Sequence, residues 1–92
     1  MVDEFMVVCT FRAGTDMREV FAVVAEEQAA VAALSAEGTL GDIRLALVRG
    51  TVFIQAFGAD AEAATAAVRS LPMAKWWDVD VFPIAVPAIG GS

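Results

Sequence analysis

Residues 15–38 constrain the fold of this chain most, because T-D-M-R-E-V-F-A-V-V-A-E-E-Q-A-A-V-A-A-L-S-A-E-G predicts one long helix. Asp16 is typical of an N-cap, Glu19 is spaced to complete a capping box, and Gly38 is typical of the residue that follows a helix. A helix advances about 100° per residue, which gathers one broad apolar face. That face consists of Met17, Val20, Phe21, Val24 and Val31, with Val23 and Leu34 at its edge.

Glu27 falls inside this apolar arc, between Leu34 and Val20, and Gln28 falls beside Met17. The neighbouring Glu26 falls on the opposite side of the helix, toward water. A carboxylate that faces a core needs a partner, a pocket or a proton. Glu27 is therefore the strongest indication of a functional site in the sequence.

Composition indicates one small domain that covers residues 1–92 and buries surface against another subunit. Apolar residues make up 59% of the 92 residues, a high fraction for so short a chain. The net charge of −6, with scattered basic residues, argues against nucleic acid and anionic membranes as partners. The chain has no apolar run near the ~18 residues of a membrane span, and its start, M-V-D-E, lacks the basic residues of a signal peptide. We expect a soluble, cytoplasmic protein.

The cysteine and histidine content removes several kinds of chemistry. Cys9 is the single cysteine, which excludes an internal disulfide, and the chain has no histidine, which removes most zinc and triad chemistry. Because no cation stands near Cys9 in sequence, we expect a small buried hydrophobe and not a reactive thiol. We expect no metal site.

Four strands and a second, shorter helix follow from the patterns along the chain. The predicted strands are residues 4–11, 40–48, 51–58 and 79–86, and the shorter helix is residues 61–70, capped by Asp60. Arg49-Gly50 favours a tight turn between two antiparallel strands, and Pro83 predicts an edge strand or a bulge. Gln55, polar in an apolar strand, faces either solvent or a subunit partner, or it lines a pocket. Residues 73–78 read as irregular and residues 87–92 as a frayed tail.

This order, βαββαβ, predicts an α+β fold of the ferredoxin-like type: a four-stranded antiparallel sheet with both helices on one face. Along the first strand, Phe5, Val7 and Cys9 alternate with Met6 and Val8, so both faces of the sheet are apolar. The helices cover one face. A second copy of the sheet would cover the other, which predicts a dimeric α+β barrel.

Three segments carry a resemblance to a known family: residues 25–40 (A-E-E-Q-A-A-V-A-A-L-S-A-E-G-T-L), 48–50 (V-R-G) and 70–84 (S-L-P-M-A-K-W-W-D-V-D-V-F-P-I). In order and in pattern they resemble the muconolactone isomerase family, over nearly the whole chain. The chain departs from the family pattern at Gln28, where a basic residue is expected, and at residues 74–77. The resemblance implies a ferredoxin-like dimeric barrel that assembles into larger homo-oligomers. It also implies a cofactor-free isomerase of aromatic-compound catabolism, which moves a ring double bond of a lactone by proton transfer.

Moving a double bond next to a carbonyl needs a base that takes and returns a proton, and a donor for the enolate oxygen. Glu27 suits the base, because desolvation raises the pKa of a carboxylate toward neutrality. The alternative is a structural ion pair with Arg44 or Arg49, across the barrel or the dimer interface. Gln28 either donates to the substrate oxygen or satisfies a buried backbone group.

The candidates for substrate binding are Arg44, Arg49 and Lys75, which either hold a substrate carboxylate or are surface charges, and Trp76 and Trp77. The tryptophans either wall a pocket or plug an oligomer interface. Three function classes follow: an isomerase-like enzyme acting on a small cyclic lactone, ketone or acid, a silent small-molecule binder, and a pure assembly module.

Overall fold

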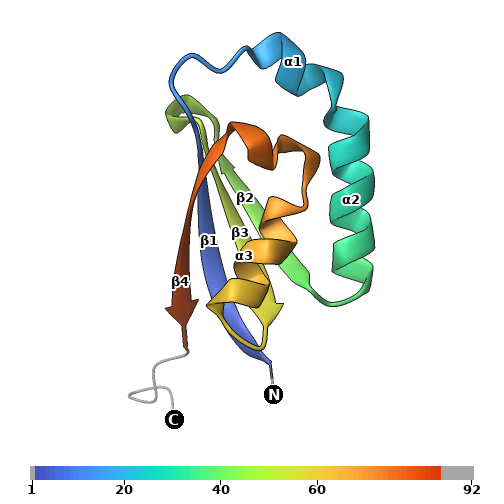
Figure 1. Ribbon diagram of the computed structural model, residues 1–92, viewed down its shortest axis with the longest axis vertical. Coiled ribbons are helices and arrows are strands. Elements are labelled where there is room, and N and C mark those ends of the chain that lie inside the picture. The colour runs from blue at the N-terminus through green and yellow to red at the C-terminus, as the bar shows by residue number, and fades with distance from the viewer. Residues whose placement is uncertain (1, 86–92) are drawn as a thin grey trace.

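Four strands form one antiparallel sheet in the computed structural model, which describes residues 2–85 (Figure 1). They are β1 (Asp3–Phe11), β2 (Leu40–Ala46), β3 (Thr51–Gly58) and β4 (Trp77–Ile84), in the order β2-β3-β1-β4. With its helices the sheet makes an α+β fold that is compatible with the predicted ferredoxin-like type. The antiparallel pairing of β2 with β3 and the edge position of the strand that holds Pro83 are both confirmed. An edge strand tolerates proline because it pairs on one side only.

The first helix is not continuous, contrary to the prediction for residues 15–38. It consists of α1 (Met17–Ala22) and α2 (Val24–Ala36), which meet at Val23, where φ is −108° and ψ is 12°. Adjacent β-branched residues at 23 and 24 lose side-chain freedom in a helix, which makes this position a weak one. The break lets α1 turn across the end of the sheet while α2 runs alongside it (Figure 1).

The predicted ends of this helical region are confirmed, although the capping box is not. The Asp16 carboxylate accepts the N–H of Arg18 at 2.9 Å, so it caps the first turn without the reciprocal bond from Glu19. At the other end Gly38 has a φ of +80°, and the N–H of Thr39 donates to the carbonyl of Leu34 at 2.9 Å. This arrangement is a Schellman motif, which favours glycine because of its left-handed backbone.

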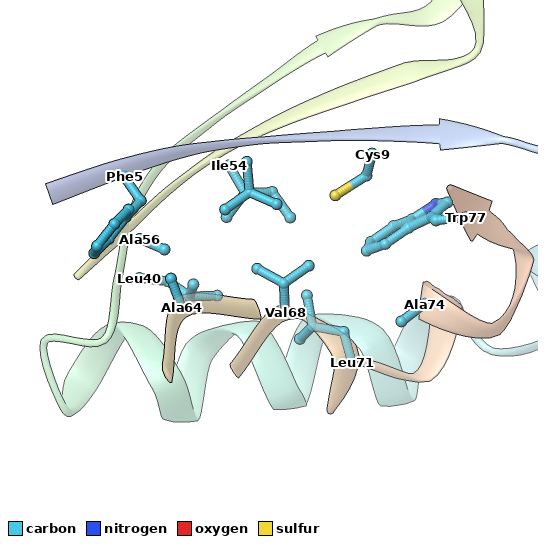
Figure 2. Packing of buried hydrophobic residues seen from close by; sticks show 11 residues of the cluster. Phe5, Cys9, Leu40, Ile54, Ala56, Ala64, Val68, Leu71, Ala74 and Trp77 are labelled. Carbon is cyan, nitrogen blue, oxygen red and sulfur yellow. The ribbon is translucent and has the colours of Figure 1, made fainter. Parts of the chain in front are cut away.

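The core lies between the sheet and α3 (Ala61–Arg69), together with the 3-10 turn η2 (Pro72–Trp76). Cys9 and Ile54 point from the sheet toward Val68 of α3, as Figure 2 shows, and Val7 belongs to the same buried cluster. Cys9 has no exposed surface, and burial raises the pKa of its thiol to about 12, so the predicted buried hydrophobe is confirmed. By contrast, α2 has no fully buried residue, and it leaves space between itself and the sheet.

Residues 2–85 leave the second face of the sheet uncovered. Exposed apolar side chains on it include Phe53, Phe82 and Ile84. Gln55 lies on this face and not in a pocket: its amide donates to Glu4 at 2.7 Å and accepts the N–H of Asp42 at 2.9 Å.

Several predicted boundaries change, and β1 begins at Asp3, one residue early. β2 ends at Ala46, and Leu47–Arg49 form a 3-10 turn, η1, before Gly50 takes a left-handed conformation (φ 62°). The shorter helix ends at Arg69, one residue early. The segment predicted as irregular is η2 followed by the start of β4 at Trp77, and the predicted strand end at Val86 and the tail 87–92 lie outside the described residues. Within residues 2–85, no helix has both the length and the apolar character to cross a membrane.

Candidate functional site

A cavity of about 500 Å³ lies between α1, α2 and the sheet, a volume typical of small-molecule sites. Its wall is almost entirely apolar. The aliphatic and aromatic residues that line it come from every element around it and include Phe11, Val20, Phe21, Val24, Val31, Ile43, Leu45, Leu47, Val52, Ile54 and Met73. The apolar helix face that the sequence predicts therefore faces a cavity and not a filled core.

Glu27 lies on this wall, half-buried, as its helical phase predicts. Its Oε1 accepts the backbone N–H of Met73 at 2.9 Å, which ties α2 to η2. Burial raises the pKa of the Glu27 carboxyl above its ordinary value of 4.5, and the bond from Met73 acts in the opposite direction. Glu26 is exposed, also as predicted. A half-buried carboxyl with a raised pKa in an apolar cavity can exchange a proton with a bound molecule.

The alternative considered for Glu27, an ion pair with Arg44 or Arg49, is not formed within residues 2–85 of the single chain; a pair across a dimer interface stays a prediction. The ion pairs among residues 2–85 join Arg12 to Asp78, Arg18 to Asp16 and Arg44 to Asp42. No cation among residues 2–85 lowers the pKa of Glu27 by its charge, and desolvation dominates.

The structure brings Gln28 and Trp77 together with Glu27 around the cavity. Gln28 follows Glu27 on α2 and is exposed at the wall, where its amide is accessible to a ligand. Trp77 begins β4, is 1% exposed and packs edge-on against Phe11, with ring centroids 6.0 Å apart. Its buried indole N–H has no hydrogen-bond partner among residues 2–85.

The other predicted binding residues do not line the cavity. Arg44 lies on the uncovered sheet face, with its guanidinium 3.7 Å from the Asp42 carboxylate. Arg49 is exposed in η1, and the Lys75 ammonium lies 4.5 Å from the centroid of the Trp76 ring. Their roles in substrate binding stay predictions.

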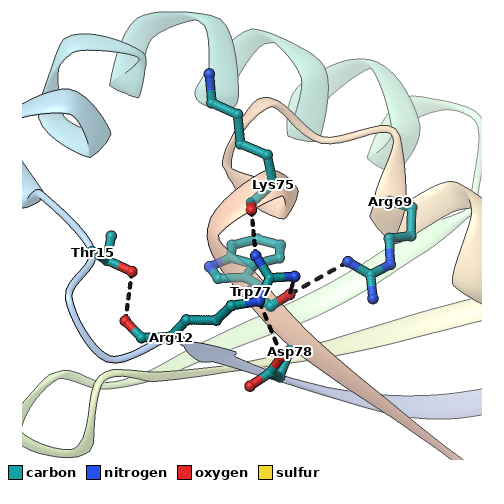
Figure 3. A network of polar contacts seen from close by, with 6 residues as sticks. All are labelled: Arg12, Thr15, Arg69, Lys75, Trp77 and Asp78. Carbon is teal, nitrogen blue, oxygen red and sulfur yellow. Dashed lines mark hydrogen bonds and ion pairs between the residues drawn. The ribbon is translucent and has the colours of Figure 1, made fainter.

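Sequence reasoning missed Arg12, whose guanidinium fixes the turn that holds Met73. It donates to the carbonyls of Lys75 at 2.6 Å and Trp77 at 2.9 Å and pairs with Asp78 at 3.1 Å (Figure 3). Arg69 also donates to the Trp77 carbonyl, at 3.3 Å. These partners are 63 to 66 residues from Arg12 in sequence, so no local pattern could reveal them.

Within residues 2–85, no cluster of acidic or cysteine side chains is arranged to hold a metal ion. No protein-family model and no curated protein matches this chain. The function therefore has to be inferred from the cavity and the carboxyl group on its wall.

Proposed function

We propose that this protein is a cofactor-independent, isomerase-like enzyme, which moves a proton and a double bond in a small cyclic lactone, ketone or acid, as its resemblance to the muconolactone isomerase family suggests. The observation that carries the proposal is the position of Glu27. Its carboxyl group has a raised pKa and stands on the wall of an apolar cavity of about 500 Å³, with no cation paired to it among residues 2–85.

In the proposed reaction, the Glu27 carboxylate removes a proton from the carbon next to the substrate carbonyl. The C–H electron pair moves into the ring system, and negative charge develops on the carbonyl oxygen. Gln28 donates its amide N–H to that oxygen. The protonated Glu27 then returns the same proton to a second carbon of the conjugated system, so the substrate is isomerised and the enzyme is regenerated.

Desolvation supports this role, because a carboxylate that is less stable as an anion is a stronger base. The Met73 N–H orients one oxygen of Glu27, which leaves Oε2 without a hydrogen bond from residues 2–85. One oxygen is thus held by the fold while the other is free to take a proton. This division fits a positioned base.

The test needs no natural substrate. In D₂O, the proposed base should exchange the α protons of a cyclic ketone such as 2-decalone, which mass spectrometry reads as deuterium gained. Glu27→Gln should lower the exchange rate by about 100-fold or more, because the amide keeps the shape and an acceptor oxygen for Met73 but cannot take the proton. Glu26→Gln, one residue away on the solvent side, is the matched control. Equal rates in the two variants would show that Glu27 is not the base.

A second candidate function is a silent small-molecule binder built on the same cavity. The bond between Glu27 and Met73 favours it, since that bond gives the carboxylate a structural use that involves no turnover. Ligand binding without any deuterium exchange in the wild type would select this function. If the protein shows neither ligand binding nor deuterium exchange, the remaining function is that of an assembly module.

We also propose that the chain forms a homodimer or a larger homo-oligomer, in which two uncovered sheet faces close into a dimeric α+β barrel. Arg44, Phe53, Val8 and Asp80 form one row across this face, with the two charges at opposite edges of the sheet. A two-fold axis in the interface and parallel to the strands sets Arg44 against the partner's Asp80, twice, and Phe53 against apolar surface. This self-complementary pattern supports a second copy as the occupant.

A further inference from the structure

Glu27 is the one charged residue among those of residues 2–85 that line the cavity. The remaining wall is apolar apart from the Gln28 amide and the indole edge of Trp77. Arg44, Arg49 and Lys75, which could hold a substrate carboxylate, lie elsewhere. A ligand in this cavity therefore meets one acidic group, one amide and apolar surface.

The mouth of the cavity is also apolar. Met17 and Phe21 of α1, with Leu45 and Leu47 from the end of the β2–β3 hairpin, line the cavity and expose large apolar surfaces; Phe21 is 68% and Leu47 is 80% exposed. An anion would lose its hydration along this rim. The rim lies on the helix side of the sheet, opposite the face proposed for the dimer, so that dimer brings no cation to it.

We infer that the ligand of this cavity is an uncharged cyclic carbonyl compound, such as a ketone, lactone or ester, and that the Glu27 carboxylate excludes carboxylate ligands. The inference rests on the proposed function and narrows it, because that function alone leaves lactones, ketones and acids open.

Two physical costs act against an anionic ligand. A carboxylate that enters an apolar cavity loses water, and this loss is compensated only by a cation or by several hydrogen-bond donors. Its charge would also be repelled by Glu27 at close range in a medium of low dielectric constant. A neutral carbonyl oxygen needs only one donor, which the Gln28 amide supplies, and its ring can fill the apolar volume.

The experiment compares probes that share one ring system: decahydronaphthalene-2-carboxylate, its methyl ester and 2-decalone. The acid and the ester do not absorb where tryptophan is excited, and the weak carbonyl band of the ketone is corrected for with a blank titration. The protein carries Trp76→Phe. Because the chain has two tryptophans and no tyrosine, this change leaves Trp77, on the cavity wall, as the only indole. Fluorescence titrations at pH 8, repeated by calorimetry, give the affinities without any need for turnover.

We expect the ester and the ketone to bind at least about tenfold more tightly than the carboxylate. Glu27→Gln should reduce this gap by improving the affinity for the carboxylate, whereas Glu26→Gln should leave it unchanged. A circular dichroism melt checks that both variants are folded. The wild-type comparison of acid with ester does not depend on any change at Glu27.

A carboxylate that binds as tightly as its ester overturns the inference while the cavity stays a ligand site. A gap that Glu27→Gln leaves unchanged also overturns it, because the exclusion would then not come from that charge. If none of the three probes binds, the inference and the proposed function fail together. Selective binding of the neutral probes without deuterium exchange supports the inference and rejects the isomerase.

Discussion

Val7 and Val8 are neighbours on β1, yet Val7 has no exposed surface and Val8 faces the uncovered side of the sheet. The rows beside them differ in the same way. In its row, Val7 pairs with Ile54 and Val81, and none of these residues is charged. The row of Val8 begins at Arg44 on one edge of the sheet and ends at Asp80 on the other, so it has a charge at each end. Charged side chains are costly on the face that α3 covers, because they would be buried there. On the other face, the charges at the two edges disfavour nonspecific association and permit pairing with a surface of complementary charge.

The largest expected effect separates the two faces directly. Val7→Asp should prevent folding, because an unpaired carboxylate would be buried in the core at a cost of several kcal/mol. Val8→Asp should leave a folded chain, with a native circular dichroism spectrum, that no longer self-associates in analytical ultracentrifugation. A Val8→Asp protein that fails to fold even when dilute would show that the two faces do not differ as described.

The second largest effect concerns the contacts of the Arg12 guanidinium with Lys75, Trp77 and Asp78, which we call the Arg12 clamp. These contacts lie at the edge of the covered side of the sheet. Arg12→Met keeps much of the aliphatic stem but removes the donors to the carbonyls of Lys75 and Trp77, so we expect a loss of about 1–3 kcal/mol in unfolding free energy. Urea denaturation measures it. Arg18→Met, on an exposed guanidinium whose ion pair among residues 2–85 is with Asp16, is the control and should change little. Equal losses would mean that the clamp adds no stability beyond that of an exposed ion pair.

Charge reversal then sharpens the proposal for the uncovered face. Arg44→Asp and Asp80→Arg should each weaken dimerisation by about tenfold, because each change sets like charges together at two symmetric places. The double variant should recover most of the loss, since it exchanges the two charges. Sedimentation at several protein concentrations gives the dissociation constants. A double variant that is weaker than both single ones would reject the proposed two-fold axis.

The smallest expected effect is the pH dependence that Glu27 adds to stability. Burial raises the pKa of its carboxyl in the folded state, so the folded protein binds the proton more tightly than the unfolded chain does. The contribution is fully present below the unfolded pKa and is lost as pH rises through the folded one. The unfolding free energy of the wild type should thus decrease relative to that of Glu27→Gln as pH increases from about 4.5 toward neutrality. Glu26→Gln should follow the wild-type profile, and a relative gain for the wild type with rising pH would indicate an ion pair instead.

Local patterns were enough to predict most of the fold. Alternation in residues 4–11 and 51–58, the glycines at 38 and 50 and the cap at Asp60 placed the strands, the hairpin and the shorter helix. The break at Val23 was missed, because helical periodicity continues through it and the bend depends on where the sheet ends. Propensity alone does not decide such a position.

For the candidate site, helical phase was enough to predict which of two adjacent glutamates turns inward. It could not predict what the inward face meets, since a filled core and a cavity leave the same apolar pattern in α2. The Arg12 clamp and the bond from Met73 to Glu27 could not be predicted from the sequence either, because both join residues that only the folded chain brings together. Placing Arg44 relative to the cavity required the sheet register, and placing Arg49 and Lys75 required the positions of the turns η1 and η2.

The buried cysteine makes local opening of this protein measurable by thiol modification. Cys9 is the only thiol in the chain, it sits in the covered face of a central strand, and at neutral pH almost none of it is ionised. A thiol reagent can therefore modify it only when β1 parts from α3, and at high reagent concentration the rate of modification becomes the rate of that opening. Ligands that fill the cavity, or a partner that covers the other face, should slow this reaction without touching the sulfur, so one unaltered side chain can report both kinds of binding.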